Sequence, residues 1–86
     1  MVYLLEKRID AGNAAETEEK LLTAYRENGP LVLDAKELEY ISSAGLRVLL
    51  KVRKMQDTLR IDNVSEEIYE ILEITGFDSL MEIHKA

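Results

Sequence analysis

Two adjacent serines at a small-residue corner are the side chains best placed for chemistry in this 86-residue sequence. Ser42 and Ser43 are followed by Ala44 and Gly45, and a helical pattern begins at this point. A serine just before a helix can accept a hydrogen bond from a backbone N–H, and the free amides there leave a partly positive site. Spacing alone favours Ser43 as a helix cap over Ser43 as a reactive group, with Gly45 allowing close packing.

The other residue types offer little to an enzyme or a metal ion. The one histidine, His84, lies near the end of the chain, where a solvated role is more common than a catalytic one. The absence of cysteine excludes disulfides and thiolate metal sites. The glycines are isolated and form no phosphate-binding loop, and the carboxylates show no acid/base spacing. We therefore predict no enzymatic activity, no metal site and no cofactor.

Composition is that of one small globular domain spanning residues 1–86, with 47% hydrophobic and 33% charged residues. The net charge of −6 argues against nucleic acid as a direct partner, because phosphates require a basic face. The apolar runs are far too short to cross a bilayer, so no membrane insertion is expected. The first residues lack the long apolar stretch of a secretion signal, and we expect a cytoplasmic protein.

The corner sits between an extended approach and a helix. Residues Leu38–Ile41 read as the approach, and apolar residues then recur at helical spacing from about Ala44 to Gln56. Polar side chains are confined to a strip that contains Arg47, Lys51 and Lys54. Most of the remaining circumference can be buried, which predicts a central helix lying over a sheet.

A second helix is predicted from residue 14 to residue 28. Asn13 and Glu16 have the spacing of a capping box, in which each side chain satisfies an amide of the other residue. Gly29 tolerates a left-handed turn and Pro30 cannot continue a helix, so the pair ends it.

Strands and helices alternate along the rest of the chain. A third helix follows Ser65 as its cap and ends at Gly76. The strands are expected at Val2–Ile9, Leu31–Leu33, Leu59–Asp62 and, as a last edge strand, Leu80–Ile83. Such alternation implies right-handed crossovers. We therefore predict an α/β domain with a mixed, mostly parallel four-stranded sheet covered by three main helices.

The segment Tyr40-Ile-Ser-Ser-Ala-Gly-Leu-Arg-Val-Leu-Leu50 resembles the signature of the STAS domain. This family includes bacterial anti-sigma factor antagonists, stress-signalling scaffolds and transporter subunits. Further segments resemble other parts of the family, namely Arg8–Ala14, Leu31–Asp34, Asn63–Ser65 and Leu72–Phe77. The resemblance therefore covers nearly the whole chain, as a short variant of the family. It departs from the family pattern at Ser42, where an aspartate is common, and at Ala44, where serine or threonine is common.

What the resemblance implies is an anti-sigma factor antagonist controlled by phosphorylation. The family's phosphate acceptor falls on Ser43, with Ser42 a weaker candidate. The unphosphorylated form would bind an anti-sigma factor, often itself a serine/threonine protein kinase, and phosphate would block that complex. The implied docking surface comprises Asp10, Asp34, Ser42, Ala44, Gly45, Leu46 and Arg47.

Simpler roles exist for several of these residues. Asp10 and Asp34 are explained equally well as aspartates that cap turns at strand ends. Arg47 belongs to a basic run with Lys51, Arg53 and Lys54, and most such runs are a solvated face. The sharper alternative is that Arg47, about one turn beyond Ser43, helps to bind the phosphate or an acidic patch on a partner.

Two rival functions come from other classes. One is a STAS subunit that docks on a membrane-associated lipid or solute transporter, an alternative that is kept because the family's common aspartate is missing. The other is a scaffold that self-associates. Typical members carry an additional N-terminal strand, so this chain is expected to present an open sheet edge that can form a homodimer.

Overall fold

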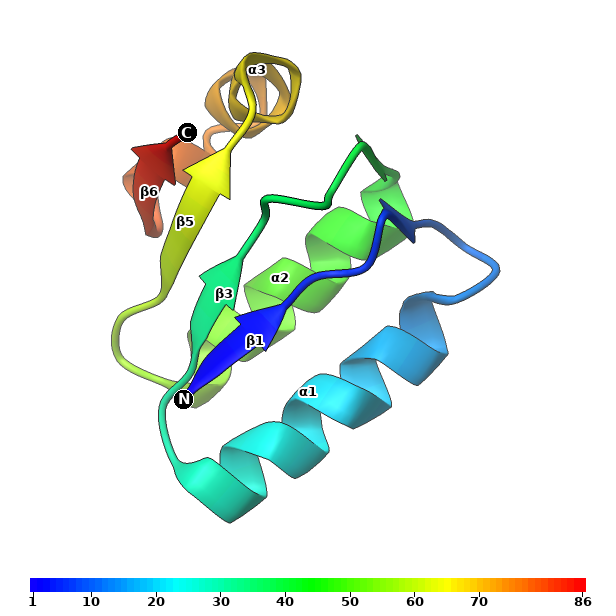
Figure 1. Cartoon of the computed structure of the whole chain (residues 1–86), viewed down its shortest axis with the longest axis vertical. Helices are drawn as coiled ribbons and strands as arrows, with labels where there is room; N and C mark the ends of the chain where they lie inside the picture. Colours follow the sequence, from blue (N-terminus) through cyan, green and yellow to red (C-terminus); the bar gives the residue numbers. More distant parts are fainter.

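Four parallel strands form the main sheet, in the order β1-β3-β5-β6 (Figure 1). The computed structural model describes all 86 residues. Its elements along the chain are β1 Val2–Leu4, β2 Arg8–Ile9, α1 Ala14–Asn28, β3 Val32–Asp34, β4 Tyr40–Ile41, α2 Ser43–Met55, β5 Arg60–Val64, α3 Glu66–Ile74, the 3₁₀ turn η1 Phe77–Ser79 and β6 Glu82–Lys85. The predicted α/β fold with three helices and a four-stranded sheet is confirmed.

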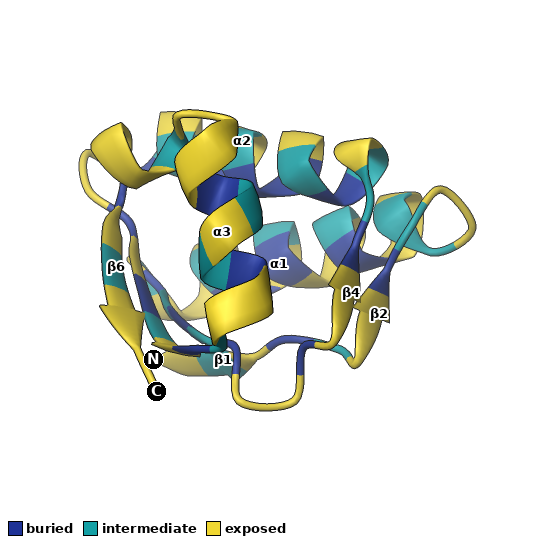
Figure 2. Cartoon of the chain, turned by 90° about the horizontal axis from the view of Figure 1, so that it is seen from above, coloured by how far each residue is buried: buried dark blue, intermediate teal, exposed yellow.

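The three helices lie on one side of the main sheet and leave its other side bare (Figure 2). One row of paired residues, Tyr3, Leu33 and Ile61, is buried or half-buried beneath the helices. The next row contains the exposed Val2 and Arg60. Side chains alternate across a strand, so the sheet has one apolar face and one open face. The apolar face joins a core cluster of 18 buried residues.

The N-terminal segment differs from the single strand expected over Val2–Ile9. It forms two strands that belong to different sheets, because β1 pairs with β3 whereas β2 pairs with β4 in a separate two-stranded ribbon. The side chain of Glu6, in the link, accepts hydrogen bonds from Tyr3 and from Thr17 of α1. These bonds hold the link between β1 and β2 against α1. The β2–β4 ribbon follows this link and leads into the serine corner.

Helix α1 has the predicted bounds, but its predicted capping box is not formed. Asn13 makes no side-chain bond to the first turn of α1. Its Oδ1 instead accepts from the backbone N–H of Asp10 at 2.8 Å, and its Nδ2 donates to the carbonyl of Arg8 at 2.7 Å. The Asn13 side chain therefore ties the end of β2 to the start of α1. Gly29 ends the helix with φ of 77°, as expected of a residue without a side chain.

The C-terminal elements follow the expected order with shifted bounds. Ser65 caps α3 through a bond from the Ile68 amide to its Oγ at 3.3 Å, and Gly76 takes the left-handed conformation just after the helix. The η1 turn then occupies three residues, so β6 begins two residues later than predicted. It is the edge strand expected there, and it pairs in parallel with β5. None of the helices combines the length and the apolar character needed to span a bilayer.

Candidate functional site

The serine corner is built where the β2–β4 ribbon leads into α2. Strands β2 and β4 pair in parallel, with Ile9 opposite Ile41, and the amide of Ser42 donates to the carbonyl of Ile9 at 2.9 Å. The residue after Ile9 is Asp10, which therefore leaves the ribbon beside Ser42. Among the predicted site residues outside α2, Asp10 is the one that the ribbon places beside the serines.

Gly45 allows α2 to approach the ribbon closely. A Cβ at this position would lie 2.6 Å from Cγ1 of Ile41 and 2.8 Å from the carbonyl oxygen of Ile9, both shorter than real Cβ contacts. Gly45 must therefore lack a side chain, because the backbone of Ile9 packs against it. It fixes the first turn of α2, and with it both serines, against β2 and β4.

Ser42, and not Ser43, is the cap of α2, which corrects the prediction made from spacing. The backbone of Ser42 is extended, and its Oγ accepts a hydrogen bond from the Gly45 amide at 3.3 Å. Its carbonyl accepts the Leu46 amide at 2.9 Å. Ser42 ends the β4 ladder, so the helix begins one residue earlier than expected, at Ser43. The Ser42 hydroxyl therefore satisfies a backbone group beside Ser43.

Ser43 is consequently an exposed first residue of α2 whose hydroxyl has no bond to the rest of the chain. The amides of Ser43 and Ala44 lie in the first turn and have no hydrogen-bond partner within the protein. This turn contains no acidic residue. Arg47 follows one turn later, exposed and without an ion pair. The free amides and the Arg47 guanidinium therefore place positive charge on the same helix end as Ser43 Oγ.

Asp10 has local partners beside the corner. Its Oδ1 accepts the Gly12 amide at 2.9 Å, and its Oδ2 lies 3.5 Å from Nε of Arg8. The Arg8 guanidinium stacks over the ring of Tyr40, 4.5 Å from its centroid. Asp10 thus has the turn-forming role considered above. Sequence reasoning did not place Arg8 and Tyr40 at the corner. The pattern that could have indicated them is the strand alternation that leaves Tyr40 exposed next to the buried Ile41.

The basic residues of α2 do not form one free face. Lys51 bonds Glu18 of α1 at 3.0 Å, and Nε of Arg53 donates to the carbonyl of Leu80 at 2.7 Å. Arg47 and Lys54 are exposed and unpaired. Ala44 and Leu46 are half-buried, and Leu46 packs against the core. Of the basic run, only Arg47 is both free and one turn from Ser43.

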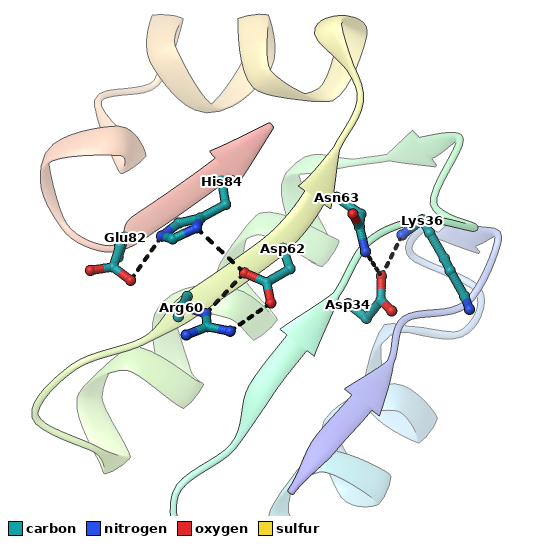
Figure 3. Close-up of polar contacts among 7 residues, drawn as sticks. All are labelled: Asp34, Lys36, Arg60, Asp62, Asn63, Glu82 and His84. Carbon is teal, nitrogen blue, oxygen red and sulfur yellow. Dashed lines mark hydrogen bonds and ion pairs between the residues drawn. The ribbon is translucent and has the colours of Figure 1, made fainter. Parts of the chain in front are cut away.

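Asp34 belongs to a second polar cluster, at the carboxyl end of β3 (Figure 3). Its Oδ1 accepts from Nδ2 of Asn63 at 3.1 Å and from the Lys36 amide at 3.0 Å. The bond from Asn63, followed by that from Lys36, lowers the pKa of Asp34 below its ordinary value. None of its polar contacts reaches residues 42–47. The structure therefore does not join Asp34 to the serine corner by any bond.

A separate charged network lies on the open face of the sheet (Figure 3). Arg60 makes two bonds of 2.9 Å to the carboxylate of Asp62, and these bonds lower the pKa of Asp62. His84 lies 3.9 Å from Asp62 and 2.9 Å from Glu82. No short motif signals this network, because its members come together through pairing of β5 with β6.

The surface at the corner is not hollowed. Four hollows open on the molecule, and none of them is lined by residues 40–47. A small ligand requires a concave site. A surface of this form, carrying a free hydroxyl and a free guanidinium, suits contact with another protein.

The sequence profile of the STAS domain matches residues 1–86. BtrV of Bordetella bronchiseptica, named as a candidate anti-sigma factor antagonist, is 35% identical over 89 positions that span 96% of this chain and 76% of that protein. The anti-sigma-B factor antagonist of Bacillus subtilis is 29% identical over 79 positions, spanning 87% of this chain and 72% of that protein.

A solved structure shares the fold. It is that of a candidate anti-sigma factor antagonist from Thermotoga maritima, with a TM-score of 0.85 over 99% of this chain and 80% of that one. The two sequences are 17% identical, so the likeness concerns the fold alone.

Proposed function

Because the chain belongs to the STAS domain family, we propose that it acts as an anti-sigma factor antagonist that is switched by phosphorylation of Ser43. Its relatives in Bordetella bronchiseptica and Bacillus subtilis carry that name. In this proposal the unphosphorylated chain binds an anti-sigma factor that is also a serine/threonine kinase, and so releases a sigma factor in the cytoplasm. The chain itself acts by binding and not by catalysis.

The observation that carries the proposal is the free, exposed hydroxyl of Ser43 on the first turn of α2. A kinase can reach this oxygen, because no other part of the chain bonds it. In the transfer, Ser43 Oγ attacks the γ-phosphorus of ATP, its proton passes to a base of the kinase, and ADP leaves. Ser42 stands where the family commonly has an aspartate, and it serves as the cap of α2. The proposed phosphate acceptor, Ser43, is unaffected by this departure.

The free amides of the first turn and the free guanidinium of Arg47 support the switch. A phosphate carries nearly two negative charges at pH 7, and the free amides of Ser43 and Ala44 are the groups that bind such a charge at a helix start. Arg47 lies on the same helix face, four residues on, where side chains meet. The proposed docking surface is the corner: Asp10, Ser42, Ser43, Ala44, Gly45, Leu46 and Arg47. Phosphorylation would reverse the sign of its centre and oppose the complex.

The test uses the purified chain, a purified anti-sigma kinase from the same genome and ATP, with the phosphate located by mass spectrometry. We expect phosphate on Ser43 in the parent chain and in Ser42→Ala, and none in Ser43→Ala. Ser43→Asp is expected to weaken binding to the kinase, and Ser43→Ala to retain it. Phosphate at another residue, or full binding by Ser43→Asp, would refute the switch.

The transporter alternative is separated by a second measurement. A pull-down from membranes that enriches a transporter ATPase, unchanged by Ser43→Ala and Ser43→Asp, would favour a STAS subunit of a transporter. Enrichment of a kinase that is lost with Ser43→Asp would favour the antagonist.

A further inference from the structure

The two edges of the main sheet are protected very differently. Strand β6 carries Glu82, His84 and Lys85 and pairs with β5 through an irregular register. Charges and bulges are the means by which proteins block edge-to-edge pairing. Strand β1 has neither, and its Val2 and Leu4 are 61% and 49% exposed. The β1 edge is therefore open to another strand.

The backbone of β1 has groups available for such pairing. Met1 accepts the Val32 amide, and Leu5 donates to the carbonyl of Asp34, so these residues turn their polar groups toward β3. By alternation, Val2 and Leu4 direct their N–H and C=O groups outward. An added strand would extend the main sheet beyond β1 by hydrogen bonds to these two residues.

A groove runs along α1 and reaches Met1, the residue that precedes β1. Its volume is about 390 Å³, and it is lined by Met1 and by the α1 stripe Glu16, Glu19, Lys20, Thr23 and Glu27, among others. Glu16 pairs with Lys20 at 3.2 Å, whereas Glu19 and Glu27 have no cationic partner. The stripe from residue 16 to residue 27 is about 17 Å long, which matches about five residues of extended chain.

The edge and groove together define the occupant. In a strand paired with β1, alternate side chains lie on the open face beside Val2 and Leu4, and the others face the groove. The first set meets apolar side chains and the second meets unpaired carboxylates. We infer that the β1 edge binds an extended segment of another protein in which apolar and basic residues alternate. This inference does not depend on the proposed switch at Ser43.

A second copy of the chain fits this edge less well. Pairing of β1 with β1 about a two-fold axis would bring a second α1 alongside the first. Glu19 and Glu27 of both copies would then face one another, and like charges at close range oppose association.

The test titrates the isotopically labelled chain with the peptide acetyl-Val-Lys-Val-Lys-Val-amide, followed by NMR. We expect the Val2 and Leu4 amides to shift and become protected from exchange, whereas acetyl-Val-Glu-Val-Glu-Val-amide causes no such change. Neutralising both carboxylates, in Glu19→Gln/Glu27→Gln, is expected to weaken binding about threefold to tenfold. The matched control on α3, Glu67→Gln/Glu73→Gln, and Ser43→Ala are expected to leave it unchanged.

Leu4→Lys places a charge on the edge and is expected to abolish binding of the basic peptide. Equal binding of the two peptides, or shifts confined to other strands, would overturn the inference. Sedimentation provides the remaining outcome: a dimer of the parent chain that is lost in Leu4→Lys would assign the edge to a second copy and overturn the proposed peptide site.

Discussion

The side chain of Gln56 pairs with the backbone of Leu31 as a neighbouring strand would. Its Oε1 accepts the Leu31 amide at 2.9 Å, and its Nε2 donates to the Leu31 carbonyl at 2.9 Å. Nε2 also donates to the carbonyl of Thr58 at 2.9 Å. Gln56 is buried and lies at the end of α2, so one amide group joins that helix to the chain entering β3 and to the turn before β5.

Replacing Gln56 by leucine should destabilise the fold. The change leaves the Leu31 N–H and C=O without partners, and each buried unsatisfied group costs about 1–3 kcal/mol. We expect the free energy of unfolding, measured in urea, to fall by about 2–6 kcal/mol. Asp57→Asn, at the exposed neighbouring residue, is the control and should change it by less than about 0.5 kcal/mol. Equal stability of Gln56→Leu and the parent would mean that water replaces the lost bonds.

Gly45→Ala tests the close approach of α2 to the ribbon. An added methyl group must displace the Ile9 backbone or the Ile41 side chain, and overpacking of this kind costs about 1–3 kcal/mol. Alanine is otherwise the better helix former by about 1 kcal/mol, so a loss of stability would identify packing as the cause. Lys54→Ala, at an exposed position of the same helix, serves as the control. A more stable Gly45→Ala protein would contradict the geometry.

Alanine substitutions at Ser42 and Ser43 should have different effects on the free energy of unfolding. Ser42→Ala removes the acceptor of the Gly45 amide and is expected to lower the free energy of unfolding by about 1 kcal/mol, as for other lost helix caps. Ser43→Ala removes an exposed hydroxyl without a bond and should be neutral within about 0.5 kcal/mol. Ser42→Asp retains an acceptor and should restore stability. The reverse order of the two alanine variants would place the cap on Ser43.

The pKa of Asp34 should depend on Asn63. Asn63 is the one non-glycine residue with positive φ, 56°, so Asn63→Gly is compatible with the backbone while removing the bond to Asp34. We expect NMR titration to show a higher Asp34 pKa in this variant and an unchanged Asp62 pKa. A shift of both, or of neither, would contradict this assignment.

The sign of the accompanying stability change follows from linkage. The folded-state pKa of Asp34 lies below the unfolded value of about 3.9, so its ionised form stabilises the fold above that pH. This contribution is lost as the pH falls through the folded pKa. Asn63→Gly should therefore show a weaker loss of stability on acidification below about pH 4 than the parent chain.

Arg47 should interact with a phosphate on Ser43. In the chain with phosphoserine incorporated at position 43, ³¹P NMR would follow the second ionisation of the phosphate, near pH 6. A free guanidinium four residues on stabilises the dianion, so Arg47→Gln is expected to raise the phosphate pKa by a few tenths of a pH unit. Lys54→Gln, at the far end of α2, is the control. No difference between Arg47→Gln and the phosphorylated parent would remove Arg47 from this role.

Elements set by local chemistry were predictable from sequence. Helix α1 ends where Gly29 and Pro30 require it, and α3 begins after Ser65 for an equally local reason. The motif around Ser43 and Gly45 also identified the family. These features depend on residues that lie next to one another in the chain.

The features that sequence did not reveal depend on distant partners. The break between β1 and β2 involves the bond that Thr17 donates to Glu6, and the failed capping box reflects the bonds of Asn13 with Arg8 and Asp10. Which serine caps α2 is decided by the bond between Ser42 and Ile9. The partners of Asp34 are set by the pairing of β3 with β5. Patterns of neighbouring residues do not indicate which distant segments pair.

Capping of α2 by Ser42 also bears on how often the corner can change state. A group attached to Ser43 leaves the bond between Gly45 and Ser42 in place, so α2 need not unwind when charge is added or removed. The serine that caps α2 and the serine proposed to carry the phosphate are different residues. Repeated cycles of modification and removal would then run at the speed of the enzymes involved, with no refolding step between them.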